Sequence, residues 1–147
     1  LWVAGCAHRC EQCHNPITWD AEGGLPFEQT AKEELYQQLS RPYISGITFS
    51  GGDPLHPQNV EEVTALAKEI KSRFPDKTIW LYTGDLWEEV RETEIIQYLD
   101  VLVDGEFQIK KKDERLHWRG SSNQRVINVK KSLETGEVCL PDARCRV

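Results

Sequence analysis

Residues 6–13 of the chain read CAHRCEQC, which places three cysteines within eight positions. They follow the short apolar run LWV at residues 1–3, which predicts a first strand. As thiolates, cysteines are soft ligands that suit zinc or an iron–sulfur cluster. A closed zinc site or a common cluster takes four protein ligands, and no fourth cysteine lies nearby. Cys6, Cys10 and Cys13 therefore predict a metal site with one open position, which is typical of a reactive centre.

Two other interpretations of this stretch stay open at this point. His8 or His14 could complete a zinc site, and the chain would then be a non-catalytic zinc-binding interaction module. The thiols could also be packing residues, although a loop that contains Arg9 and Glu11 is too polar for a core. Colour separates an iron–sulfur cluster from a zinc site, because a cluster protein assembled without oxygen is brown and a zinc protein is colourless.

The whole chain narrows the class of protein. It has 147 residues, which predicts a single domain over residues 1–147, and a net charge of −6, which argues against a nucleic-acid binder. Clustered thiols and an odd total of five cysteines argue against a disulfide framework and favour a reducing, cytoplasmic setting. No run approaches the roughly 18 apolar residues of a membrane span, and no signal peptide is visible.

Hydrophobic spacing predicts strands that alternate with helices. After the first strand, further strands are expected at residues 44–50, 78–83, 101–103 and 125–129. Helices are expected over residues 27–39, 60–74 and 85–99, the last with a capping-box start at Asp85 and Glu88. Beyond residue 130 the pattern fades into a loose tail. Such alternation predicts βαβ units and a mostly parallel sheet, hence an α/β fold.

Polar and glycine residues follow the predicted strands. Parallel sheets bind ligands beyond the carboxyl ends of their strands, so a site is expected there. In chain order these ends carry the cysteine loop, Gly51-Gly52-Asp53, Thr83-Gly84-Asp85, Asp104-Gly105-Glu106 and Asn128.

The sequence resembles the radical S-adenosylmethionine (SAM) family. The likeness rests on the cysteine spacing after the first strand and on SGGDP at residues 50–54. Two more motifs, LVDG at 102–105 and RGSSNQR at 119–125, are similar to the branch that activates anaerobic ribonucleoside-triphosphate reductase. The likeness covers residues 1–129 and implies an open, partial (βα) barrel. Family members carry further residues before this first strand and the chain has no Met, so we expect a truncated N-terminus.

The resemblance also implies an activity, that of a radical SAM oxidoreductase. In the family three cysteines, here Cys6, Cys10 and Cys13, hold a [4Fe–4S] cluster, and SAM chelates the fourth iron. Reductive cleavage of SAM then gives a 5′-deoxyadenosyl radical. In this branch it takes a hydrogen from a backbone glycine of the large glycyl-radical subunit of the reductase. An activator of pyruvate formate-lyase type and a small-molecule radical SAM enzyme are the alternatives, and the short chain and residues 119–125 argue against both.

Several residues are expected to bind SAM. The resemblance assigns Gly51, Gly52 and Asp53 to its methionine amino group, although a Gly-Gly pair alone usually marks a turn. Thr83 and Asp104 stand at two strand ends, where Asp104 could hold a cation or a polar group of SAM or could only make a turn.

The backbone around the third cysteine runs along the adenine of SAM in the family. In this chain that stretch is Gln12, Cys13 and His14. The residue before the last cysteine is often aromatic in the family, and Gln12 departs from that pattern. His14 could supply a planar face instead, or be a surface histidine without a role.

Three further features lie outside the residues expected to bind SAM. The segment Arg119–Arg125 could dock the glycine loop of the partner. The run Lys110–Lys112 is either a solvated surface or a landing site for an acidic electron donor such as flavodoxin. Cys139 and Cys145 lie beyond the matched region, and their role is left open.

Overall fold

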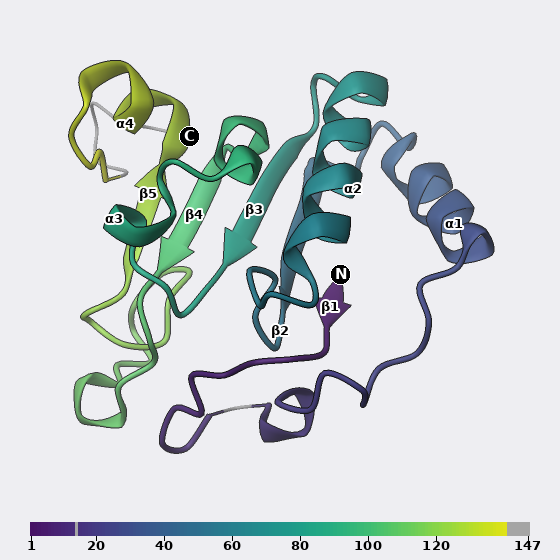
Figure 1. The fold of residues 1–147 in the computed structure, drawn as a ribbon. Coiled ribbons are helices and arrows are strands. Elements are labelled where there is room, and N and C mark those ends of the chain that lie inside the picture. The colour runs from purple at the N-terminus through teal and green to yellow at the C-terminus, as the bar shows by residue number, and fades with distance from the viewer. Residues whose placement is uncertain (14, 141–147) are drawn as a thin grey trace.

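The computed structural model describes residues 1–13 and 15–140, which form one open sheet with helices packed on it (Figure 1). The strands, in the order in which they lie in the sheet, are β1 (Trp2–Val3), β2 (Gly46–Gly51), β3 (Thr78–Tyr82), β4 (Val101–Asp104) and β5 (Arg125–Asn128). The helices are α1 (Gln29–Leu39), α2 (Val60–Arg73), α3 (Trp87–Val90) and α4 (Val129–Thr135). Three 3₁₀ turns are η1 (Pro16–Thr18), η2 (Glu94–Tyr98) and η3 (Ile109–Lys111).

The strand directions confirm the predicted α/β class with a mostly parallel sheet. Strands β1 to β4 run parallel to one another, and β5 pairs with β4 in the antiparallel direction. Asn128 ends β5 but lies opposite Val101, at the amino end of β4. The prediction that it joins the ends of the other strands at one edge of the sheet is therefore wrong. Arg125, opposite Asp104, takes that place instead.

The core lies between the sheet and one layer of helices. Alternate strand residues point to opposite faces of a sheet, so Phe49 and Leu81 both face the helices and are fully buried. Helix α2 meets them with apolar residues three or four positions apart, which form one stripe: Val63, Leu66, Ala67 and Ile70. On the other face a smaller cluster joins Val101, Val103 and Val126 to the half-buried Trp80 and Tyr82. Strand β4 is therefore buried on both faces.

The helix expected over residues 85–99 is interrupted. It consists of one turn of α-helix, α3, followed by the 3₁₀ turn η2. The Glu89 carboxylate accepts the backbone N–H of Leu86 at 2.8 Å, so the helix begins one residue later than the capping pattern predicts. The N–H and the hydroxyl of Thr93 then both donate hydrogen bonds to the Val90 carbonyl, which ends the α-helix. The late start leaves Asp85 free to take part in the site.

The segment after residue 130 is also more ordered than predicted, because helix α4 occupies Val129–Thr135. The Asn128 side chain accepts the N–H of Lys131 and caps the helix, and Gly136 ends it with φ 77°. Within the described residues, no helix is long and apolar enough to cross a membrane.

A buried carboxylate ties this helical layer to the sheet. Asp100 accepts the Ile79 N–H at 2.8 Å, the Lys71 ammonium at 2.7 Å and the Lys130 ammonium at 3.0 Å. Burial acts to raise the pKa of Asp100, but these three donors outweigh it and hold the pKa below its ordinary value of 3.8. The charged form is therefore favoured by folding.

We expect Asp100→Asn to lower the free energy of unfolding by about 2 kcal/mol at neutral pH, because two ammonium groups lose their anion. The stabilisation by Asp100 is present above pH 3.8 and is lost as the pH falls through its lower folded-state pKa. Urea titrations of both proteins at neutral and acidic pH measure this, with Asp76→Asn at an exposed carboxylate as the control. An equal, small loss in the two variants would contradict the assignment.

Candidate metal and cofactor site

The three predicted cysteine ligands gather at one cavity of about 260 Å³ beyond the carboxyl ends of the parallel strands. Cys6, Cys10 and Cys13 are free thiols, each half-buried, and all line this cavity. The predicted SAM-binding residues that share its wall are Gly51, Gly52, Asp53 and Thr83. Residues far apart in the sequence thus meet at the edge of the sheet where a ligand site was expected.

Backbone hydrogen bonds shape the cysteine loop. The Gly5 N–H donates to the Thr18 carbonyl at 2.6 Å, and the Cys6 N–H donates to the Trp19 carbonyl at 3.1 Å. Further along, the Cys13 N–H donates to the Cys10 carbonyl at 3.2 Å. Arg9 and Gln12 turn the loop with left-handed φ values of 51° and 54°. Each turn precedes a cysteine and directs the chain back towards the cavity.

The thiols suit a metal centre with an open position. Burial raises the pKa of Cys6 and of Cys10, and for Cys10 the backbone N–H of Phe107 opposes that rise. These thiols are therefore protonated at neutral pH until a metal displaces the protons. Three soft donors fit an iron–sulfur cluster, and within residues 1–13 and 15–140 no fourth thiol lines the cavity.

The cysteine loop lies directly against the end of β2, and Gly52 makes this possible. A Cβ atom at Gly52 would lie 2.6 Å from the Gly5 carbonyl oxygen and 2.7 Å from that of Thr18. The neighbouring Asp53 N–H donates to the Gly5 carbonyl at 2.7 Å. The absence of a side chain at Gly52 is thus required by the backbone of the protein itself, before any ligand is considered.

Asp53 and Thr83 are hydrogen-bonded to each other inside the site. Asp53 is buried and accepts the Thr83 hydroxyl at 2.9 Å and the backbone N–H groups of Leu55 and Gly84. Burial acts to raise the pKa of Asp53, but the donors, led by His8, outweigh it and hold the pKa below its ordinary value. Asp53 is therefore a charged residue whose oxygens are fully engaged.

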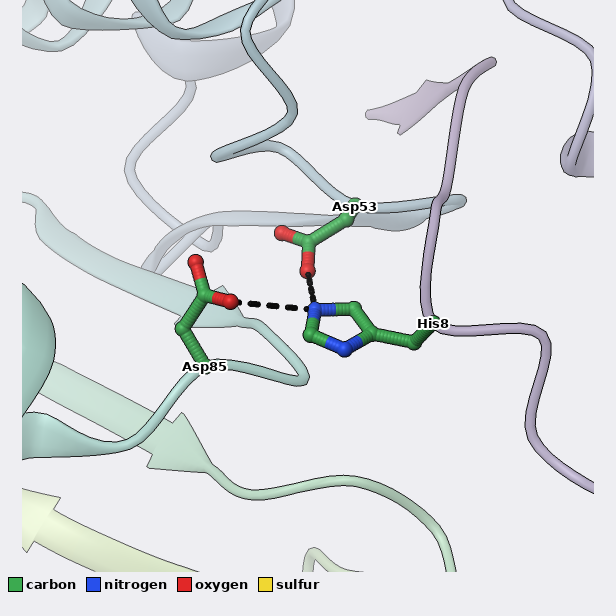
Figure 2. A group of neighbouring side chains, drawn as sticks. All are labelled: His8, Asp53 and Asp85. Carbon is green, nitrogen blue, oxygen red and sulfur yellow. Dashed lines mark ion pairs between the residues drawn. The ribbon is translucent and has the colours of Figure 1, made fainter.

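His8 was considered as a zinc ligand, and the structure gives it other partners. Its Nε2 lies 3.0 Å from Asp53 and 3.1 Å from Asp85 (Figure 2), and its Nδ1 lies 2.6 Å from Glu106. The hydrogen bond to Asp53 leads in raising the pKa of His8 to about 9, against the effect of burial and with help from Glu106 and Asp85. Carboxylates thus engage both ring nitrogens, and no cysteine belongs to the group of possible metal ligands that His8 forms with Asp53 and Asp85 among the described residues.

Two of the predicted residues lie away from the cavity wall. The Asp104 carboxylate is fully buried, accepts the Trp87 N–H at 2.9 Å and pairs with Arg125 at 2.5 Å. It joins β4 to β5 and α3, while the next residue, Gly105, reaches the cavity. Gln12 is exposed and does not line the cavity, and His14 lies outside the described residues.

The motif RGSSNQR folds into a turn at the cavity. The Gln124 side-chain oxygen accepts the N–H groups of Gly120 and Ser121, and its nitrogen donates to the Gly105 carbonyl at 3.0 Å. Arg119 donates to the Gln124 carbonyl at 2.7 Å. Both Gly120 and Gln124 line the cavity, so the motif forms part of its wall.

Three residues that line the cavity escaped the sequence analysis as site residues. His8 was noticed only as a metal ligand, although its position between two cysteines was a signal that its side chain would enter the site. Gln124 lay inside a motif whose chemistry was not assigned. Phe107 could not be recognised from its residue type, because it is the backbone N–H of Phe107 that approaches Cys10.

Comparison with known proteins agrees with this geometry. The family model described as "4Fe-4S single cluster domain" matches residues 1–127. The chain is 46% identical over 126 residues to the anaerobic ribonucleoside-triphosphate reductase-activating protein of Enterobacteria phage T4, covering 86% of this chain and 80% of that protein. The protein of the same name from Escherichia coli (strain K12) is 40% identical over 134 residues, covering 88% and 87% of the two chains. No solved structure matches.

We expect each of Cys6→Ala, Cys10→Ala and Cys13→Ala to abolish a stable four-iron cluster. The described cavity wall contains three thiols, and the cluster would need all of them as ligands. Iron and sulfide per chain after anaerobic reconstitution measure this. The control is a double Cys139→Ala, Cys145→Ala variant, since Cys139 is disulfide-bonded and lies outside the cavity wall, and Cys145 lies outside the described residues. Unchanged iron content in Cys10→Ala would refute the ligand assignment.

We also expect Gly52→Ala to disturb the cysteine loop, since the new Cβ would meet two carbonyl oxygens at 2.6 and 2.7 Å. Cluster content should fall together with the denaturation midpoint. At Gly24, the control position, the nearest atom to an added Cβ is the Ala4 side chain at 3.2 Å, so Gly24→Ala should have a weaker effect. Full cluster content in Gly52→Ala would show that the loop tolerates a wider separation.

Proposed function

Because this chain belongs to the family of anaerobic ribonucleoside-triphosphate reductase-activating proteins, we propose that it activates such a reductase as a radical SAM enzyme. It would cleave SAM reductively at a [4Fe–4S] cluster and so generate a glycyl radical on the large subunit of its partner. The observation that carries the proposal is the convergence of Cys6, Cys10 and Cys13 on one cavity at the carboxyl ends of the strands.

The protein's own part in this chemistry is binding and shielding. Cys6, Cys10 and Cys13 would bind the cluster as thiolates and leave one iron without a protein ligand. A bound cluster supplies the electron for the reductive cleavage of SAM. The turn around Gln124 and the end of β2 would limit the access of water to the cavity between them.

The end of β2 offers acceptors to the amino group of SAM. The Gly52 N–H already donates a hydrogen bond to the Val3 carbonyl, and the Asp53 N–H donates one to the Gly5 carbonyl. This backbone would therefore bind an ammonium through carbonyl oxygens, which accept the hydrogen bonds that an ammonium donates. Gly51 stands next to them in the cavity wall and belongs to the same proposed subsite.

The remaining residues that were predicted to bind SAM belong to the same proposed site. Thr83 would act beside Asp53 at the cavity wall, and Asp104 would act through Gly105. Gln12, Cys13 and His14 stay a proposed track for the adenine. The sheet, open between β1 and β5, would be a short version of the radical SAM barrel.

The partners follow from the same proposal. The large glycyl-radical subunit would deliver a mobile glycine loop into the cavity past residues 119–125. An electron donor such as flavodoxin would approach the exposed run Lys110–Lys112, where Lys112 pairs with Glu114 at 3.5 Å. Free thiols at an oxygen-sensitive centre suit the reducing cytoplasm.

The test is anaerobic activation. Mixed with SAM, a strong reductant and the large chain of an anaerobic ribonucleotide reductase, the reconstituted protein should produce a doublet glycyl-radical signal in electron paramagnetic resonance. It should also release 5′-deoxyadenosine from SAM. Mixed with pyruvate formate-lyase in the same way, it should give no glycyl radical. Activation of pyruvate formate-lyase alone would overturn the choice of partner, and no 5′-deoxyadenosine with either partner would overturn the reaction.

A further inference from the structure

We propose that His8 is a positioning residue that fastens the cysteine loop to the carboxyl ends of β2, β3 and β4, whether or not a metal is bound. The inference rests on the proposed function only in naming Cys6 and Cys10, which flank His8, as cluster ligands. The fastening itself is a property of the folded chain and can be measured without iron.

The contacts of the imidazole carry the proposal. Asp53 follows β2, Asp85 follows β3 and Glu106 follows β4, and one ring reaches all three carboxylates (Figure 2 shows the first two). The partner Glu106 is 98 positions from His8 in the sequence. Hydrogen bonds to ionised groups are about twice as strong as those between neutral groups. A single side chain thus joins four separate segments.

The site is shaped to accept this ring. A Cβ atom at Gly84 would overlap the His8 imidazole, so only glycine at this position leaves room for it. The Gly84 N–H donates to Asp53 at 3.0 Å, which turns the carboxylate towards the ring. The His8 side chain is 18% exposed, and it is therefore enclosed by the loops it joins.

The fastening acts on both halves of the proposed cofactor site. On the loop side, the carbonyl of Trp19 holds Cys6 and the N–H of Phe107 approaches Cys10, while His8 holds the segment between them. On the sheet side, Asp53 accepts the Thr83 hydroxyl and the Gly84 N–H, and the His8 ring, whose Nε2 lies 3.0 Å away, is its contact with the cysteine loop. Loss of His8 would loosen the loop and leave Asp53 with only its contacts to Leu55, Thr83 and Gly84.

Thiol labelling of the iron-free protein tests the fastening. We expect Cys10 to react with iodoacetamide about tenfold faster in His8→Ala and in His8→Phe, which keeps a ring but has no N–H donor. His8→Gln, which keeps one donor group, should fall between these variants and the wild type. His117→Gln, the same change at an exposed histidine, is the control and should label like the wild type. Glu106→Gln, which alters only the partly exposed contact, should give a small acceleration with the fold intact.

A second measurement uses the reconstituted cluster. We expect His8→Phe to need about tenfold more SAM than the wild type to change the resonance signal of the reduced cluster, because Asp53 and the loop are no longer held. Equal labelling rates in His8→Phe and wild type would overturn the inference whatever the cluster does. A wild type that labels slowly but never responds to SAM would instead overturn the proposed function and leave the role of His8 standing.

Discussion

The site depends on one close contact, that of the Gly52 backbone with the carbonyls of Gly5 and Thr18. At this separation the cysteine loop lies directly on the end of β2, and the Asp53 carboxylate lies within reach of His8. Any side chain at residue 52 would push the two apart. The ligand loop and the proposed cofactor-binding strand end are therefore positioned by the same pair of backbone segments.

Much of the fold could be predicted from the sequence because its patterns are local. Apolar residues at helical spacing gave α2 within one residue of its observed end at Arg73, and the strand ends gave the position of the cavity. The direction of β5 could not be predicted, since an alternating strand reads the same in either direction. The interrupted helix at residues 85–99 was missed because the turn at Thr93 depends on its hydroxyl rather than on hydrophobic spacing.

The site could be predicted where ligand chemistry restricts the residue type, and less well elsewhere. The cysteines Cys6, Cys10 and Cys13 were identifiable because few other roles suit three clustered thiols. The carboxylate of Asp104 looked like a site residue because it ends a strand, yet it pairs with Arg125 inside the fold. The partnership of His8 with Glu106 spans most of the chain, so a sequence without coordinates holds no trace of it.

The strand order has a consequence for the protein as it is synthesised. Strand β1 is translated before the other strands of the sheet, but it pairs with β2 through Trp2 opposite Ser50, and the carboxylates that contact His8 come later still. Long-range pairings of this kind form slowly, because a long loop of chain must close first. The thiols of the cysteine loop therefore stay exposed to oxidation until the segments that enclose them have been translated.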